Sequence, residues 1–66
     1  MNVTINGKDQ ELPENATVAD ILRELGLESR LVAVECNGRI VPRDRHSLSL
    51  VAEGDRLEIV TLVGGG

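Results

Sequence analysis

The stretch Thr17-Val18-Ala19-Asp20-Ile21-Leu22-Arg23-Glu24-Leu25-Gly26-Leu27 describes a helix whose beginning and end are both marked. Thr17 is a typical N-cap residue, and Asp20 three positions later forms a variant of the capping box. Gly26 suits the left-handed position after the last turn, where Leu27 can fold back onto the helix. Apolar residues follow the helical spacing i, i+3, i+4 and i+7, and they are Val18, Ile21, Leu22 and Leu25. We therefore predict one amphipathic helix over residues 18–25.

On the N-terminal side of this helix the sequence predicts a β-hairpin. Val3 and Ile5 alternate with polar residues, and Asn6-Gly7 is the pair favoured in tight turns whose central residues have positive φ. The return strand lies around residues 8–12, with Leu12 as its clear inward residue. Because this strand is short and polar, we expect it at an edge of the sheet.

A second hairpin and a closing strand are predicted on the C-terminal side. Residues 31–36 are mostly apolar and β-branched, Asn37-Gly38 repeats the turn signal, and a short arm covers residues 39–41. After a polar stretch, residues 53–55 predict a turn, and the apolar run at 57–63 predicts the last strand.

The predicted order is thus hairpin, helix, hairpin and strand. A single helix covers one face of a sheet, and the right-handed crossover rule lets the last strand pair beside the first. The fold class is α+β, a β-grasp or ubiquitin-like roll with a mixed sheet of about five strands covered by one helix. We expect this domain over residues 1–63 and a flexible C-terminal glycine tail over residues 64–66. A simple α+β sandwich with another strand order is the alternative.

Size, charge and composition exclude several classes of function. A chain of 66 residues is one small domain with a thin core, which makes an internal catalytic cavity improbable. The net charge of −4 repels phosphate backbones and no aromatic residue can stack on bases, so no nucleic acid is expected as a partner. No apolar run approaches the ~20 residues that span a bilayer, and no signal peptide is apparent. With one cysteine, the chain is expected to be cytoplasmic, with no membrane partner.

Outside the tail, the reactive residue types have plain structural interpretations. Cys36 lies in an apolar strand, where a thiol usually behaves as a small buried hydrophobe. His46 is expected to be a solvated loop residue, because no second histidine or cysteine pair stands near it to bind a metal. We predict no catalytic residue and no metal site. Arg39, Arg43 and Arg45 either dock on an acidic partner surface or are simply solvated.

The end of the chain, Gly64-Gly65-Gly66, follows directly on the apolar run. Glycine has no Cβ, so such a tail can thread a narrow enzyme tunnel, and residues 62–66 reach at most about 17 Å when extended. Leu62 and Val63 either seat in an apolar groove of a partner or finish the core. A terminal carboxylate is ionised at neutral pH and must be activated by another protein before it reacts. The alternative to a functional tail is an ordinary frayed chain end.

Adenylation followed by attack of a sulfur donor would turn that carboxylate into a thiocarboxylate. Residues 1–63 contain no paired base and nucleophile, no glycine-rich phosphate loop and no metal-ligand cluster. The chain would therefore be the substrate of such chemistry and not its catalyst.

Three further segments occur together in this chain: Asn37-Gly38-Arg39-Ile40-Val41-Pro42-Arg43, Glu53-Gly54-Asp55-Arg56-Leu57-Glu58-Ile59-Val60 and Val63-Gly64-Gly65-Gly66. With them the chain resembles, over essentially its whole length, the ThiS family of small sulfur-carrier proteins of thiamin thiazole synthesis. The resemblance implies that Gly66 is adenylated and then thiocarboxylated, and that its sulfur passes to thiazole synthase.

It implies three partners: an E1-like adenylating enzyme of the ThiF type that consumes ATP, a sulfur donor of the cysteine desulfurase relay, and a thiazole synthase of the ThiG type. The chain itself would bind no cofactor. Gly64, Gly65 and Gly66 would thread the partner's active site. The partner interface would include Leu62, Val63 and Arg43.

Other functions stay open at this point. A terminal diglycine also occurs in the molybdopterin-synthase small subunit and in ubiquitin, so the chain could carry sulfur for another pathway. It could also be a conjugated modifier, although its single lysine, Lys8, supplies lysine-linked chains poorly. A purely structural interaction domain with an idle tail is the third class.

Overall fold

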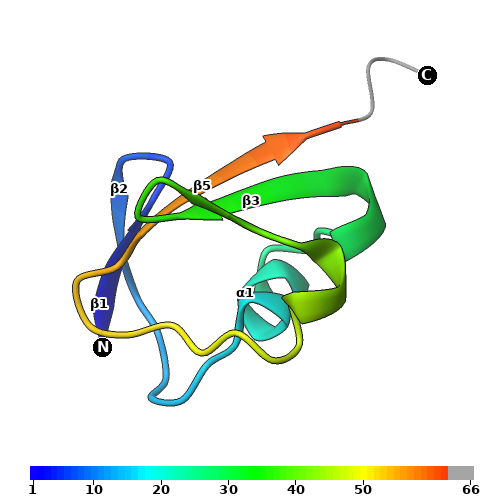
Figure 1. Ribbon diagram of the computed structural model, residues 1–66. Coiled ribbons are helices and arrows are strands. Elements are labelled where there is room, and N and C mark those ends of the chain that lie inside the picture. Colours follow the sequence, from blue (N-terminus) through cyan, green and yellow to red (C-terminus); the bar gives the residue numbers. More distant parts are fainter. Residues whose placement is uncertain (63–66) are drawn as a thin grey trace.

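The computed structural model describes residues 1–62, which form a mixed sheet of five strands with one α-helix against one of its faces (Figure 1). The predicted order of hairpin, helix, hairpin and strand is confirmed. Val63 and residues 64–66 lie outside the described residues, and so does the predicted tail. The strands are β1 (Asn2–Ile5), β2 (Lys8–Glu11), β3 (Val32–Cys36), β4 (Arg39–Val41) and β5 (Arg56–Thr61). The helix is α1 (Val18–Glu24), and two 3₁₀ turns are η1 (Ser29–Leu31) and η2 (Arg43–Arg45).

The strands lie in the order β2-β1-β5-β3-β4, so the closing strand β5 is central. It runs parallel to β1, with Thr4 opposite Arg56, and antiparallel to β3. The two hairpins β1–β2 and β3–β4 supply the outer strands, and the polar strand β2 lies at an edge as predicted. This is the predicted β-grasp roll, and the alternative strand order is wrong.

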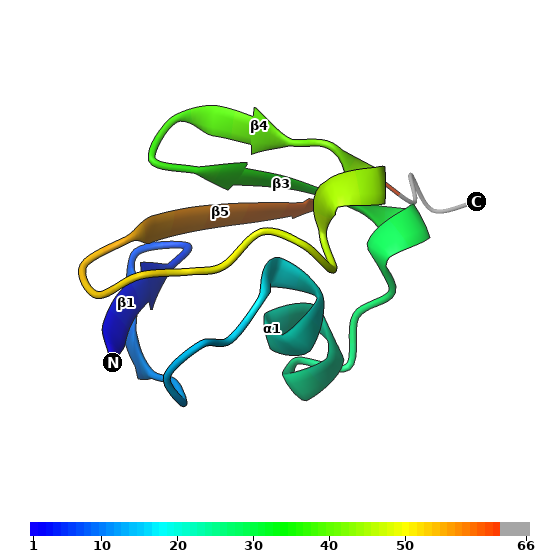
Figure 2. The same ribbon diagram turned by 60° about the horizontal axis from the view of Figure 1, so that its bottom comes forward.

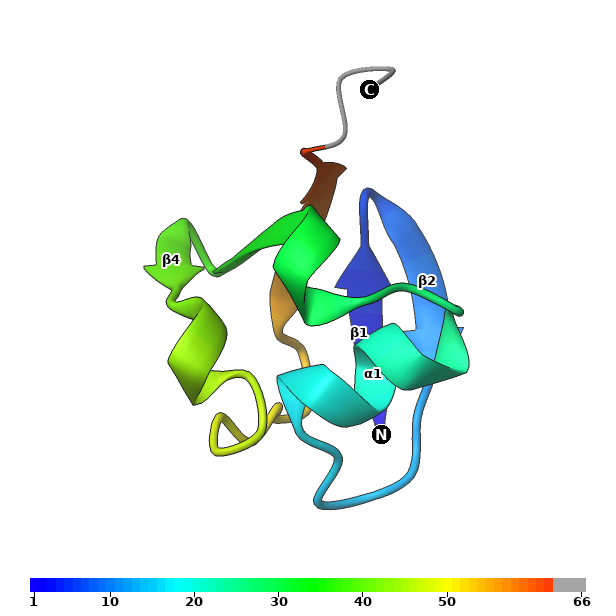
Figure 3. The ribbon, with the colours of Figure 1, turned by 90° about the vertical axis from the view of Figure 1, so that its right-hand side faces the viewer.

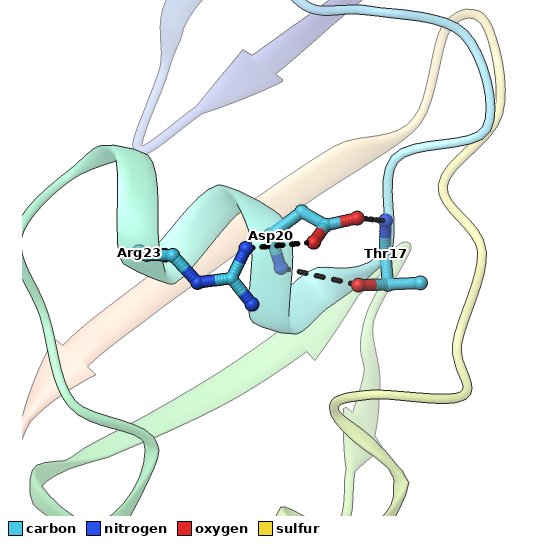
Figure 4. A network of polar contacts seen from close by, with 3 residues as sticks. All are labelled: Thr17, Asp20 and Arg23. Atoms are coloured by element: carbon cyan, nitrogen blue, oxygen red, sulfur yellow. Dashed lines mark hydrogen bonds and ion pairs between the residues drawn. The ribbon is translucent and has the colours of Figure 1, made fainter.

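Helix α1 begins with the predicted capping box (Figure 4). The Asp20 backbone N–H donates to Thr17 Oγ1 at 3.1 Å, and the Thr17 backbone N–H donates to Asp20 Oδ2 at 2.9 Å. These bonds satisfy two N–H groups that a helix start would leave unpaired. The hydrogen bond from the Thr17 backbone is the main cause that lowers the pKa of Asp20, helped by the Thr17 hydroxyl and Arg23.

The helix ends one residue earlier than predicted, at Glu24, with Leu25 as its C-cap. Gly26 takes a φ of +74° and its N–H donates to the Arg23 carbonyl at 3.1 Å. The Leu27 N–H donates to the Leu22 carbonyl at 2.8 Å, which completes a Schellman motif. Leu27 is half-buried against the core, as the sequence predicts.

The core lies between α1 and the sheet (Figure 2). Strands β1, β3 and β5 turn alternate residues inward, and α1 contributes one apolar stripe to the same layer. Ile21, Leu22, Val34 and Leu57 have the largest fully buried side chains. The buried apolar residues are Val3, Ile5, Leu12, Ala16, Val18, Ile21, Leu22, Val32, Val34, Val51, Leu57 and Ile59.

The outer face of the sheet is a mixture of acidic and apolar side chains. Glu35 of β3 stands directly opposite Glu58 of β5, and Ile40 of β4 stands on the other side of Glu35. Both glutamates are exposed, and neither has an ion pair within residues 1–62. Ile40 is 71% exposed and Val60 is 59% exposed.

His46 is not the solvated loop residue that the sequence predicts, because its side chain is only 2% exposed. Its Nε2 lies 3.1 Å from the Val41 carbonyl, and its own carbonyl accepts from the Ala19 N–H at 2.8 Å. Residues 46–51 fold over the start of α1, where Val18 N–H donates to the Ser49 carbonyl. The ring is therefore buried against the end of β4, while the His46 backbone contacts the start of α1.

Candidate functional site

The C-terminal end of β5 is the place from which the predicted reactive residues depart. Figure 3 shows this strand reaching the end of the molecule remote from the N-terminus. Hydrogen-bonded neighbours flank β5 on both sides, β1 on one and β3 on the other. The segment after Leu62 thus follows the central strand of the sheet.

Asn6 extends the contacts of β5 beyond the end of β1. The parallel ladder reaches the Asn6 N–H, which donates to the Leu57 carbonyl at 2.9 Å, and there the chain turns away at Gly7. The Asn6 side chain then takes over: Oδ1 accepts from the Ile59 N–H at 2.7 Å, and Nδ2 donates to the Ile59 carbonyl at 3.1 Å. The oxygen and nitrogen of the Asn6 side-chain amide thus make the two hydrogen bonds to Ile59 that the backbone of one more β1 residue would make.

Asn37 makes a similar clamp near the beginning of β5, from the side of β3. Its backbone N–H donates to the Arg56 carbonyl at 2.7 Å, and its Oδ1 accepts from the Arg56 N–H at 2.9 Å. Its Nδ2 donates to Asp55 Oδ1 at 3.0 Å. The sequence predicts Asn6 and Asn37 only as turn residues, and both do have positive φ, 51° and 54°. The repeated choice of asparagine before glycine is the signal that could have pointed to side-chain roles.

Leu62 continues the sheet by one bond past β5, since its N–H donates to the Leu31 carbonyl at 2.8 Å. Its side chain is 55% exposed, so it does not finish the core. Of the two alternatives for Leu62, the structure favours a side chain that is accessible to a partner. Val63 lies outside the described residues.

Of the three arginines that the sequence singles out, Arg43 is the one held near Leu62. Its Nη2 donates to the Arg30 carbonyl at 3.3 Å, one residue before the Leu31 that holds Leu62. Arg39 instead pairs with Cys36 at the opposite end of β3. Arg45 is exposed in η2.

Cys36 is half-buried at the far end of β3 from Leu62, and its Sγ donates to Asp55 Oδ2 at 3.6 Å. Burial, and then the negative charge of Asp55, raise the pKa of the Cys36 thiol. Partial burial acts to raise the pKa of Asp55 too, but hydrogen bonds from the Ala52 N–H, Asn37 and Cys36 outweigh it and lower that pKa. A protonated, hydrogen-bonded thiol is a poor nucleophile, which favours the structural interpretation of Cys36.

The described residues offer no assembled catalytic centre. Within residues 1–62 no group of three or more histidine, cysteine, aspartate or glutamate side chains could hold a metal ion. A surface hollow of about 270 Å³ lies beside α1 and includes residues 12–16, but no residue of β5 lines it. None of the helices in this part of the chain is long and apolar enough to cross a membrane.

Known proteins share both this sequence and this fold. The model of the ThiS family matches residues 3–66. The sulfur carrier protein ThiS of Bacillus subtilis is 36% identical over 63 residues, which cover 94% of this chain and 96% of that protein. The crystal structure of the thiamine biosynthesis protein (ThiS) from Geobacter metallireducens has a TM-score of 0.85 and 33% identity, with 100% of both chains covered.

A thiazole synthase of Paramagnetospirillum magneticum is 46% identical over all 66 residues, yet the chain spans only 20% of that protein. The same share holds for a 32% identical thiazole synthase of Magnetococcus marinus. A segment like this chain therefore makes up a fifth of each of these larger proteins. Since the family match covers almost every residue and the solved relative has the same fold throughout, the chain belongs to the ThiS family.

Proposed function

We propose that this protein is a sulfur carrier of thiamin biosynthesis and a co-substrate, not an enzyme. In this proposal a ThiF-type enzyme adenylates the Gly66 carboxylate with ATP, a sulfur donor converts it to a thiocarboxylate, and thiazole synthase takes the sulfur. The observation that carries the proposal is the family match, which runs through Gly66. In the sequence three glycines follow the central strand β5, with Leu62 and Val63 between them and the end of the strand.

The chemistry needs little from the folded body. The carboxylate oxygen attacks the α-phosphorus of ATP, and pyrophosphate leaves. With bisulfide as the simplest donor, sulfur then attacks the carbonyl carbon and the products are the thiocarboxylate, AMP and a proton. Residues 1–62 would contribute an anchored strand and an accessible Leu62, whereas Gly64, Gly65 and Gly66 would enter the partner's active site without a Cβ to obstruct them.

Thiazole synthase is the proposed recipient because two thiazole synthases contain a segment that is similar to this whole chain. In those two proteins a segment similar to this chain and a thiazole synthase thus share one polypeptide. The cysteine desulfurase relay remains the proposed source of sulfur, and the cytoplasm the proposed compartment.

Intact-mass measurement tests the carrier role directly. The full chain is incubated with a ThiF-type enzyme, ATP and sulfide, and its mass should rise by the difference between sulfur and oxygen. A variant that lacks Gly65 and Gly66 should keep its far-UV circular dichroism, because every described helix and strand and the whole described core lie within residues 1–62, but it should gain no mass. An unchanged mass of the full chain, with an enzyme that loads its own carrier under the same conditions, would overturn the proposal.

The pathway needs a separate assay, because a carrier for molybdopterin synthesis would gain the same mass. The loaded chain is mixed with thiazole synthase and the remaining thiazole precursors, and thiazole formation is followed. Sulfur loading without any thiazole would assign the protein to another sulfur pathway.

A further inference from the structure

The surface around Leu62 differs in charge from the rest of the molecule. The chain as a whole has a net charge of −4. In contrast, η1 and η2 together with Glu28 hold three arginines and two acidic residues, so these seven residues have a net charge of +1. Figure 2 shows both turns on the side of the molecule where β5 finishes.

Two of these arginines are tied to the strand end by contacts. Leu31 holds Leu62 through the 2.8 Å backbone bond, and Arg43 lies against η1 through its 3.3 Å bond to the Arg30 carbonyl. Arg30 Nε lies 3.4 Å from Glu28 Oε1, and this is the one ion pair of Arg30 among residues 1–62. Within the same residues Arg43 has no ion pair at all. Several guanidinium N–H groups therefore remain available beside the exit of the chain.

The fold makes little use of these two side chains. The Arg30 side chain is 67% exposed and its pairing with Glu28 is a surface contact of the kind that contributes at most about 1 kcal/mol. Arg43 is exposed, and its bond to the Arg30 carbonyl is long. Arginine is one of the residue types that are enriched among the energetically dominant contacts of protein interfaces.

We infer that Arg30 and Arg43 form a cationic collar around the end of β5, and that this collar docks on carboxylates at the active-site entrance of thiazole synthase. The inference rests on the proposed function and adds the contact that would orient the carrier. A guanidinium group matches a carboxylate with two parallel hydrogen bonds, and Leu62 would supply the apolar contact between the two charges. Because the whole chain carries a net charge of −4, an acidic partner surface has to be met through this local patch. Thiazole synthase is the proposed partner because two thiazole synthases contain a segment that is similar to this whole chain.

The test compares charge reversals at the collar with one elsewhere. Arg43→Glu and Arg30→Glu are made in the full chain, and Arg39→Glu is the matched control. Arg39 is exposed, has no ion pair within residues 1–62 and lies at the other end of β3, so its reversal changes the net charge equally. Affinity for full-length thiazole synthase is measured by titration calorimetry at two salt concentrations. Far-UV circular dichroism verifies that each variant is folded.

We expect Arg43→Glu to raise Kd by about tenfold or more and Arg39→Glu to change it by less than about threefold. Wild-type binding should weaken as salt increases, and Arg43→Glu should reduce that dependence. Arg43→Lys, which keeps the charge but not the planar fork, should recover part of the loss. The proposed role of the collar would be refuted if the three charge reversals changed Kd equally, or if the Kd of the wild type did not depend on salt concentration. Sulfur loading of the wild type by the ThiF-type enzyme is scored separately, so its failure would refute the proposed function, whereas unchanged Kd values would refute only the collar.

Discussion

Replacing Asn6 by glycine should destabilise the protein through β5. Asn6 has a φ of +51°, a conformation that glycine adopts freely, so the turn itself can still form. What the substitution removes is the side-chain amide, with its 2.7 Å bond from the Ile59 N–H and its 3.1 Å bond to the Ile59 carbonyl. The carbonyl and N–H of a central strand then lose their partners on the side of β1.

Each of these two bonds should contribute about 0.5–1.5 kcal/mol to the free energy of unfolding. Water can reach part of the site because Asn6 is exposed, so we expect a combined loss of about 1–2 kcal/mol. A domain of this length has a total stability of only about 3–10 kcal/mol, at about 0.05–0.15 kcal/mol per residue. With a urea m-value of about 1 kcal/mol/M, the midpoint should fall by about 1–2 M.

Asn15→Gly is the matched control. Asn15 also has a positive φ, 64°, and is exposed, but its side chain makes no hydrogen bond within residues 1–62. Both variants add the same freedom to the unfolded chain, so this contribution cancels in the comparison. Because the protein has no aromatic residue, urea unfolding is followed by far-UV circular dichroism and not by fluorescence.

The expected result is a midpoint for Asn6→Gly clearly below that of Asn15→Gly, with equal m-values. Midpoints that agree to within about 0.3 M would show that water replaces the amide at no cost, and the clamp would then have no energetic role. Asn6→Asp provides a further check, since it keeps the acceptor for the Ile59 N–H but sets an oxygen against the Ile59 carbonyl. The urea midpoint of Asn6→Asp should fall at least as far as that of Asn6→Gly.

Three further predictions concern charge and the thiol. The folded-state pKa of Asp55 is lowered, so its contribution to stability is complete above the unfolded pKa of about 3.9 and is lost as pH falls through the folded pKa. Asp55→Asn should therefore be less stable than wild type at neutral pH, and the difference between their urea midpoints should shrink as the pH is lowered below about 3.9. Because the pKa of Cys36 is raised, iodoacetamide should alkylate this thiol at neutral pH more slowly than it alkylates a cysteine peptide. The Asp55→Asn variant should be alkylated faster than wild type. Equal alkylation rates in wild type and Asp55→Asn would contradict the role of the Asp55 carboxylate. Glu58→Gln removes a like charge directly opposite Glu35 and should raise the free energy of unfolding by about 0.2–1 kcal/mol, with no gain at high salt.

The elements of this fold could be predicted from the sequence because their signals are local. The capping box and the Schellman motif of α1 lie within eleven residues of one another, and each Asn-Gly turn fixes its own hairpin. The pairing of β5 beside β1 followed from a general rule of handedness together with the position of a single helix. Local chemistry and topology thus agree throughout this chain.

What could not be predicted depends on contacts between distant residues. The burial of His46 arises because its segment folds over the start of α1, and no spacing within that segment indicates this. The Asn6 amide meets Ile59, which is 53 positions away in the chain. Likewise, the approach of Arg43 to Leu62 needs η1 between them. The roles of Val63, Gly64, Gly65 and Gly66 stay predictions, since these residues lie outside the described part of the chain.

The central place of β5 has a mechanical consequence for a protein that is gripped by its last residues. A pull on the chain after Leu62 loads β5 along its own axis, in shear against both neighbours. The ladder bonds to β1 and β3 lie across that axis, so they must rupture together and not one after another. The strands that can be unzipped singly, β2 and β4, are attached elsewhere and bear none of this force directly. An enzyme that pulls on the C-terminal end of this protein would therefore apply force in the direction in which the fold best resists mechanical unfolding.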